Sequence, residues 1–199
     1  MKKLIGFATL ALALAAPAVQ AQGNDAGSWL VRLRATNLHS ANSDSTGLGL
    51  TIDNKTFPEF DISYFVTPNF ATELVLTYPQ KQTVYSNGAA IGSFKHLPPT
   101  LLAQYHFTDI PGLRPYLGVG VNYTNISAVN ILNGAVGLKH GSYGLAAQAG
   151  FDVPLGGGWL LNVDVKKVQI GTHVYLNGVD QGQFKVDPLL ASVGVGLRF

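Results

Sequence analysis

His140 and Ser142 are the residues best placed for nucleophilic catalysis, because a single residue separates them in the sequence. In a β-strand this spacing puts both side chains on one face, and Asp152, which is near in sequence, is the candidate for a third, orienting residue. His39 and Ser40 are adjacent, so in a strand they point to opposite faces. Motifs this short support an enzyme, such as one that modifies lipid A, only weakly. We therefore expect no enzymatic activity and no cofactor.

Metal and nucleic-acid chemistry have even less support. The 199 residues contain no cysteine, which excludes thiolate zinc sites, and the five histidines lack the spacing of metal ligands. A formal net charge of +2 is not the basic surplus of a nucleic-acid-binding protein. Only 12% of the residues are charged, against roughly 25% in soluble domains, and 47% are hydrophobic. This composition favours lipid as the main solvent.

The first 21 residues have the three parts of a secretory signal peptide. Lys2 and Lys3 form a positive head, residues 4–16 are apolar, and Val19 and Ala21 are the small residues before a cleavage site. The apolar run is too short for the ~20 residues of a transmembrane anchor. We predict cleavage near Ala21, which leaves residues 22–199 as one domain outside the cytoplasm.

Period-two alternation dominates the rest of the chain. Apolar and polar or small residues alternate over eight segments: 29–37, 57–65, 70–78, 98–107, 114–124, 143–153, 159–166 and 187–199. The connections between them are alternately short (66–69, 108–112 and 154–158) and long (38–56, 79–97, 125–142 and 170–186). This asymmetry favours an all-β fold, an eight-stranded antiparallel transmembrane β-barrel of the bacterial outer membrane, over a soluble β-sandwich.

Aromatic residues mark one end of the predicted strands. The expected interfacial girdle comprises Trp29, Tyr64, Phe65, Phe70, Tyr105, Phe107, Tyr116, Phe151, Trp159 and Phe199. Val195 and Leu197 share a strand face with the terminal Phe199. That ending is similar to the assembly signal of outer-membrane barrels, so we expect the barrel-assembly machinery as a partner.

The alternation also predicts what fills the barrel. Nine charged residues fall on the inward face: Arg32, Arg34, Glu59, Asp61, Glu73, Asp152, Asp164, Lys166 and Arg198. An eight-stranded barrel is filled by its own side chains, and buried charges persist when they are paired. We therefore expect an ion-pair plug. It fixes the barrel and also blocks straight passage of water and solutes.

Apolar residues in the predicted loops point to a ligand site above this plug. The candidates for a ligand channel are Leu48, Leu50, Ile52, Phe57, Ile126, Ile131 and Leu132. They form either an apolar vestibule for a small hydrophobic molecule, or contacts between loops and strands that extend beyond the membrane. Pro98 and Pro99 cannot donate ladder hydrogen bonds. They predict either a lateral exit between strands or a bent strand end.

Several segments together resemble the OmpW family of outer-membrane proteins, which includes the alkane-uptake protein AlkL. They are WLVR (29–32), DISYFV (61–66), PTLLAQYHF (99–107), RPYLGVGV (114–121), WLLNVDV (159–165) and VDP (186–188). The resemblance implies an apolar channel that opens outward and is closed toward the periplasm. It also implies uptake of small hydrophobic molecules with lateral release into the membrane.

A non-transporting barrel, structural or adhesive, is the main alternative, because fold does not dictate function. Apolar loops that lean inward favour transport, whereas polar, protruding loops favour adhesion. The expected partners are outer-membrane lipid, lipopolysaccharide and a small hydrophobic ligand, without nucleic acid.

Overall fold

Eight antiparallel strands form a closed barrel in the computed structural model, which describes residues 26–199. Each barrel strand pairs with the next along the chain, and the first pairs with the last. The barrel strands are β1 (Trp29–His39), β4 (Lys55–Phe65), β5 (Phe70–Leu76), β8 (Thr100–His106), β9 (Arg114–Ile131), β11 (Gly141–Gly156), β12 (Trp159–Val168) and β15 (Leu189–Arg198). The predicted fold is confirmed. The predicted signal peptide, residues 1–21, lies outside the described residues.

The alternation of side chains sets the inside and the outside of the barrel. On β12, Leu161 and Val165 are exposed, whereas Asn162 and Asp164 between them are buried. The same parity holds along the other barrel strands. As a result the outside carries an apolar band, while charged and polar side chains fill the middle of the interior. Among residues 26–199, no helix is long and apolar enough to cross a membrane.

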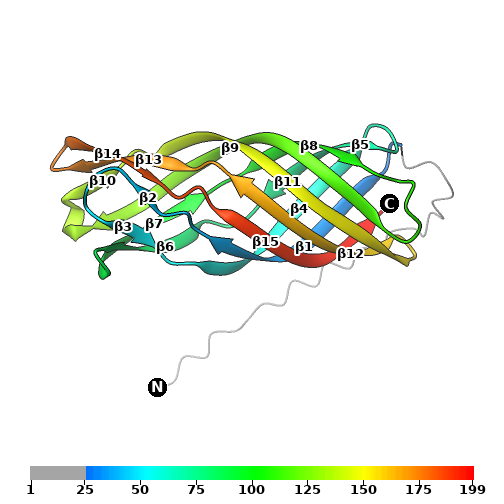
Figure 1. Cartoon of the computed structure of the whole chain (residues 1–199), viewed down its shortest axis with the longest axis horizontal. Helices are drawn as coiled ribbons and strands as arrows, with labels where there is room; N and C mark the ends of the chain where they lie inside the picture. Colours follow the sequence, from blue (N-terminus) through cyan, green and yellow to red (C-terminus); the bar gives the residue numbers. More distant parts are fainter. Residues whose placement is uncertain (1–25) are drawn as a thin grey trace, which may run out of the picture.

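The predicted long loops are mostly β-structure that extends the barrel wall. Two hairpins, β6 (Gln80–Ser86) with β7 (Ala89–Leu97) and β13 (Gly171–Leu176) with β14 (Val179–Lys185), continue it at one end. The short strands β2 (Ser43–Asp44), β3 (Leu50–Ile52) and β10 (Val136–Leu138) pair with β14, β6 and β13. Figure 1 shows these elements gathered at the end of the barrel opposite the C-terminus. We call this the hairpin end, and the other the turn end.

Exposed aromatic residues surround the turn end, as predicted, with two exceptions. Trp29, Trp159 and Phe199 are exposed there, but Phe65 and Tyr116 are buried inside the barrel. The girdle assignment of Phe65 and Tyr116 was therefore wrong. The reason is parity: both residues occupy inward positions of their strands, β4 and β9.

Candidate functional site

The centre of the barrel holds a network of buried ion pairs. Arg32, which is completely buried, donates to both carboxylate oxygens of Asp152, at 3.2 and 2.8 Å, and to Asp61 at 3.0 Å. Asn162 donates to the same Asp152 carboxylate at 2.7 Å. These residues come from β1, β4, β11 and β12, so the network ties strands across the barrel axis.

A second cluster surrounds Arg34, one inward position nearer the hairpin end. Its guanidinium lies 2.5 Å from Glu73 and 3.3 Å from both Glu59 and Asp164. Lys166 Nζ lies 3.1 Å from the same Glu59 oxygen. Together with the Arg32 cluster this is the predicted ion-pair plug, in which each buried cation contacts at least one carboxylate. The plug leaves charged side chains across the barrel axis.

Glycines on the neighbouring strand make room for the two arginines. Arg32 and Arg34 of β1 face Gly196 and Gly194 of β15. A Cβ at Gly194 would lie 2.1 Å from the Leu33 carbonyl oxygen, and a Cβ at Gly196 would lie 3.0 Å from Cγ of Arg32. Substitution of these glycines therefore requires the plug or the wall to move.

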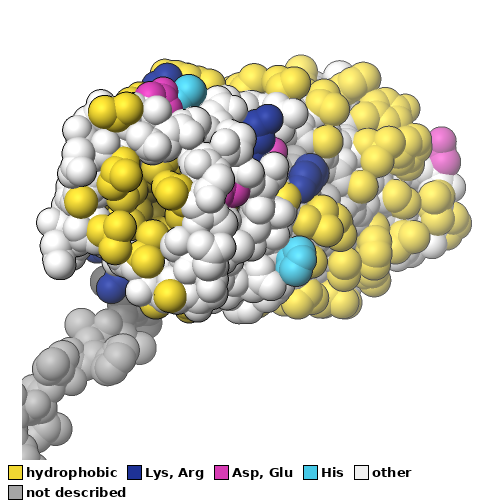
Figure 2. Space-filling model, turned by 60° about the vertical axis from the view of Figure 1, so that its left-hand side comes forward, with side chains coloured by type: hydrophobic (Ala, Val, Ile, Leu, Met, Phe, Trp, Pro, Cys, Tyr) yellow, Lys and Arg dark blue, Asp and Glu magenta, His cyan; other side chains and the backbone are white. Residues whose placement is uncertain are grey.

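An apolar cluster occupies the interior between the plug and the hairpin end, and we call it the apolar chamber. Its buried residues are Leu38, Leu50, Ile52, Phe57, Val75, Val84, Phe94, Leu102, Ile126, Ile131, Val136, Leu138, Ala146, Val168, Ile170, Val174, Phe184, Val186 and Leu190. Leu48 packs against this cluster. In Figure 2 hydrophobic side chains line a hollow at the hairpin end, and a broad hydrophobic band covers the other half of the molecule.

A small cavity lies where the apolar chamber meets the plug. It has a volume of about 20 Å³, enough for one water molecule. Leu38, Phe57 and Ile170 line it from the chamber side, and Glu59 and Lys166 line it from the plug side. The interior thus changes from apolar to ionic at this cavity.

His96 borders this cavity from β7, in the extended wall above the barrel. Its imidazole is 2% exposed and its Nε2 lies 3.3 Å from the side-chain amide of Gln82. Burial, together with the positive charge of Lys55, lowers the pKa of His96 to about 4. The imidazole is therefore neutral near pH 7 and adds no charge to the chamber.

The barrel wall is interrupted beside the same cavity. The ladder between β5 and β8 ends at the pair Val75–Thr100, and pairing resumes between β6 and β7 at Gln80–His96. Pro98, which lies in the interruption, lines the cavity. Pro99 keeps its bonds toward β9, because its carbonyl accepts from Asn122 Nδ2 and from the Tyr123 amide.

A groove on the outside of the barrel lies next to the cavity, one strand away from the interruption at Pro98. The ladder between β4 and β5 ends at Phe60–Leu76. Beyond it, a groove of about 310 Å³ is lined by Leu33, Pro58, Glu59, Phe60, Leu76, Thr77 and Tyr78. Glu59 and Thr77 line both this groove and the inner cavity. Only a thin layer of side chains therefore separates the interior from the outer surface at this point.

Comparison with known proteins identifies the family. The model of the OmpW family matches residues 25–199. The chain belongs to the OmpW family. Outer membrane protein W of Vibrio cholerae is 30% identical over 220 residues, which cover both chains completely. The crystal structure of OprG from Pseudomonas aeruginosa has a TM-score of 0.77 at 27% identity and covers 89% of this chain and 98% of its own. The solid-state NMR structure of the outer membrane protein AlkL in DMPC bilayers has a TM-score of 0.70 at 25% identity and covers 91% and 94%.

As an OmpW-family barrel the protein resides in the outer membrane, among its lipids and lipopolysaccharide. The structure brings together six of the seven residues predicted for the ligand channel, since Leu48 contacts the chamber and five others are buried in it. Leu132 is the exception. It lies in the turn 132–134 with a φ of 46° and is 49% exposed, because this left-handed conformation turns it away from the chamber.

Arg198, also predicted for the plug of this OmpW-family barrel, lies away from the Arg32 and Arg34 clusters. It lies at the turn end, where its guanidinium stacks 3.7 Å from the centre of the Phe65 ring and donates to Ser28. Val195, Leu197 and Phe199, the predicted assembly signal, lie on or next to β15, which closes the barrel. The Phe199 amide donates to the Trp29 carbonyl at 2.9 Å. The recognition role of this ending stays a prediction.

The residues considered for catalysis are not assembled in the barrel. Ser142 Oγ accepts from the Gly171 amide, whereas Asp152 lies ten residues further along β11 and pairs with Arg32. At ~3.3 Å per strand residue this is a separation of roughly 33 Å. Within residues 26–199, no three His, Asp or Glu residues are grouped so as to hold a metal ion.

Sequence reasoning missed several parts of the chamber. Val174, Phe184 and Val186 of the last hairpin region are buried in it, as are Val84 and Phe94 of the β6–β7 hairpin. Alternation within 80–86, 89–97, 171–176 and 179–185 was the available signal, although each of these strands has only six to nine residues. The Tyr116 side chain was also missed as part of the plug, where its hydroxyl donates to Asp164 at 2.9 Å.

Proposed function

We propose that this protein carries small hydrophobic molecules from outside the cell into the outer membrane. The observation that supports this most is the division of the interior, along the barrel axis, into an apolar chamber and an ion-pair plug. An apolar molecule gains contacts in the chamber, whereas entry into the plug would separate buried ion pairs whose charges the molecule cannot satisfy. The plug therefore blocks the path along the barrel axis, and the molecule leaves through the barrel wall.

The proposed lateral exit lies beside the interrupted wall, at the groove beyond the last pair of β4 and β5. The inner cavity, lined by Pro98 and Thr77, lies next to the outer groove, and Thr77 and Glu59 belong to both. We propose that the ligand leaves between β4 and the β5–β6 segment, with the interruption at Pro98 and Pro99 giving this part of the wall freedom to move. Because the cavity is only about 20 Å³, the chamber side chains must move apart to admit a ligand. The protein does this without enzymatic chemistry.

The decisive experiment places charge inside the chamber. Leu48→Asp combined with Leu50→Asp should reduce uptake of an apolar fluorescent tracer by cells about tenfold, because a buried carboxylate opposes an apolar ligand. Thr51→Asp is the matched control. Its side chain lies on the opposite face of β3, between the buried Leu50 and Ile52. Unchanged uptake with a normal yield of folded barrel in the double variant would refute the proposal and favour a structural or adhesive role.

A further inference from the structure

A second opening in the wall, on the outside of the barrel, lies between β11 and β13. Pairing of β11 with β12 ends at Ala146–Val168, and pairing of β10 with β13 begins at Leu138–Val174. Between these pairs, five hydrogen bonds cross the gap: Gln169 N to Leu145 O, Leu145 N to Gln169 Oε1, Gly171 N to Ser142 Oγ, Thr172 Oγ1 to Lys139 O and Lys139 N to His173 O. The opening, which we call the polar slot, has a volume of about 450 Å³.

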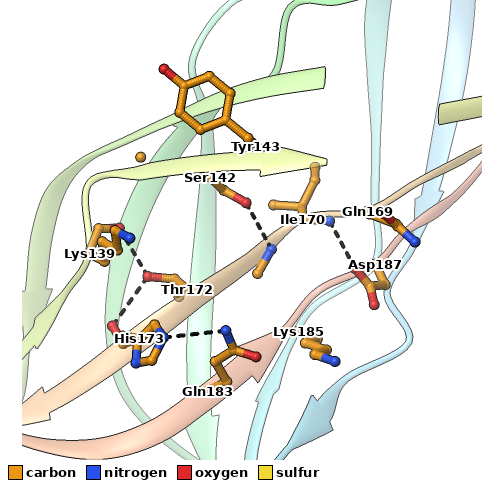
Figure 3. A pocket seen from close by; sticks show the side chains of 12 residues that line it. Lys139, Ser142, Tyr143, Gln169, Ile170, Thr172, His173, Gln183, Lys185 and Asp187 are labelled. Atoms are coloured by element: carbon orange, nitrogen blue, oxygen red, sulfur yellow. Dashed lines mark hydrogen bonds between the residues drawn. The ribbon is translucent and has the colours of Figure 1, made fainter. Parts of the chain in front are cut away.

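The residues that line the polar slot include two lysines and one carboxylate. Figure 3 shows Lys139 and Lys185 at its border, with His173 and Gln183 between them. Both lysine side chains are exposed, and in residues 26–199 no carboxylate lies within salt-bridge distance of either. Asp187 is the one carboxylate that lines the slot, and it already accepts from the Ile170 amide at 2.8 Å. A second carboxylate, Asp180, lies outside the lining and contacts His173 at 2.9 Å.

The polar slot lies at the edge of the apolar band that faces lipid. Outward residues of β12 are apolar from Trp159 to Val165, and the next outward residue is Lys167, whose Nζ binds the Asp187 carbonyl. Tyr143, which is 85% exposed, lies on the opposite edge of the slot with its ring 4.8 Å from that of Tyr123. Tyrosines followed by lysines along the barrel axis are the order expected at the boundary between acyl chains and headgroups.

We infer that the polar slot binds the phosphorylated sugar headgroup of an outer-leaflet glycolipid, namely lipopolysaccharide. Lys139 and Lys185 pair with its phosphate, and the amides of Gln169 and Gln183 hydrogen-bond its sugar hydroxyls. Tyr143 provides an apolar face beside the sugar ring and the first acyl carbons. A lipid is favoured over a soluble anion because the slot adjoins the apolar band, so that one molecule can use both surfaces.

The test measures lipid bound to the folded barrel in mild detergent by native mass spectrometry, with deep-rough lipopolysaccharide as the probe. Lys139→Glu with Lys185→Glu should lower the affinity at least tenfold. The matched control is Lys81→Glu with Lys95→Glu, which makes the same charge change on the outer face of the β6–β7 hairpin, and it should bind normally. Dephosphorylated lipid A and phosphatidylcholine should bind at least tenfold more weakly to the unmodified barrel.

Hydrogen exchange locates the site independently of affinity. Bound lipopolysaccharide should slow exchange in segments 139–145 and 169–173, and inorganic phosphate alone should not. Equal binding by the slot and control variants, or protection confined to other segments, would overturn the inference. Equal protection by inorganic phosphate would also overturn it, by showing a site for free anions.

Discussion

Lys166 and Glu59 form one ion pair that serves two regions of the interior. Their charged atoms lie 3.1 Å apart at the top of the plug, and both side chains line the small cavity at the base of the apolar chamber. Glu59 also lines the outer groove. The plug, the chamber and the proposed exit therefore meet at this pair, and changes to the plug and to the exit can be tested separately around it.

Arg32→Ala tests the plug. It removes the cation that Asp61 and Asp152 share, although Asp61 keeps its ion pair with Arg34. Breaking a buried ion pair in this way destabilises a protein by about 3–5 kcal/mol. Urea unfolding of the barrel in lipid vesicles measures the change. Lys81→Ala, an exposed lysine on β6, is the control and should shift the free energy of unfolding by less than about 0.5 kcal/mol. An unshifted midpoint for Arg32→Ala would show that the plug does not stabilise the barrel.

Thr77→Trp tests the exit. The larger side chain fills the position shared by the inner cavity and the outer groove. Tracer uptake should fall several-fold while the folded fraction remains unchanged. Thr72→Trp makes the same substitution on β5 at an exposed position within the apolar band and should leave uptake intact. Equal uptake by the two variants would place the exit elsewhere.

His96 predicts how acid affects the hairpin end. Its pKa is about 4 in the folded protein against an ordinary value of 6.5, so the unfolded chain binds the proton first as the pH falls. The stability that the neutral imidazole contributes is complete above about pH 6.5 and is lost between there and pH 4, by about 3 kcal/mol at most. Urea unfolding at pH 7 and at pH 4.5 should show a smaller loss for His96→Gln than for the unmodified chain. An identical loss in both would contradict this role.

Deletion of Phe199 tests the end of β15. The change removes the two backbone bonds between Phe199 and Trp29 and an exposed aromatic ring of the turn end. The amount of heat-modifiable folded barrel on gels should fall several-fold in cells. Phe199→Tyr, which retains the ring and the backbone bonds, should restore it. A normal folded band for the deletion would show that assembly does not depend on this residue.

Alternation predicted the barrel because the period of two residues assigns each residue of a strand to the lipid-facing or the interior side. It placed Arg32, Arg34 and Lys166 inside correctly, without knowledge of their partners. The extended wall was harder to predict, because its burial depends on packing between hairpins far apart in sequence. A local signal was nevertheless available: Asn87-Gly88 and Asn177-Gly178, both with positive φ, are the turn dipeptides of the two added hairpins.

Leu132 shows where composition alone misleads. It is apolar, like its neighbour Ile131, but it precedes Asn133-Gly134 in a turn and has a left-handed conformation. The alternation of inward and outward side chains does not continue through a turn, so the hydrophobicity of a turn residue does not predict its burial. The polar slot could not be predicted at all, since it exists only where two ladders, formed by distant segments, fail to meet.

The closed axis has a consequence for the cell that makes this protein. An open, water-filled pore would let water and small hydrophilic solutes leak through with every copy inserted. With Arg32 and Arg34 clamped by carboxylates across the middle, we expect that the envelope can hold this protein at high density and still remain tight to such compounds.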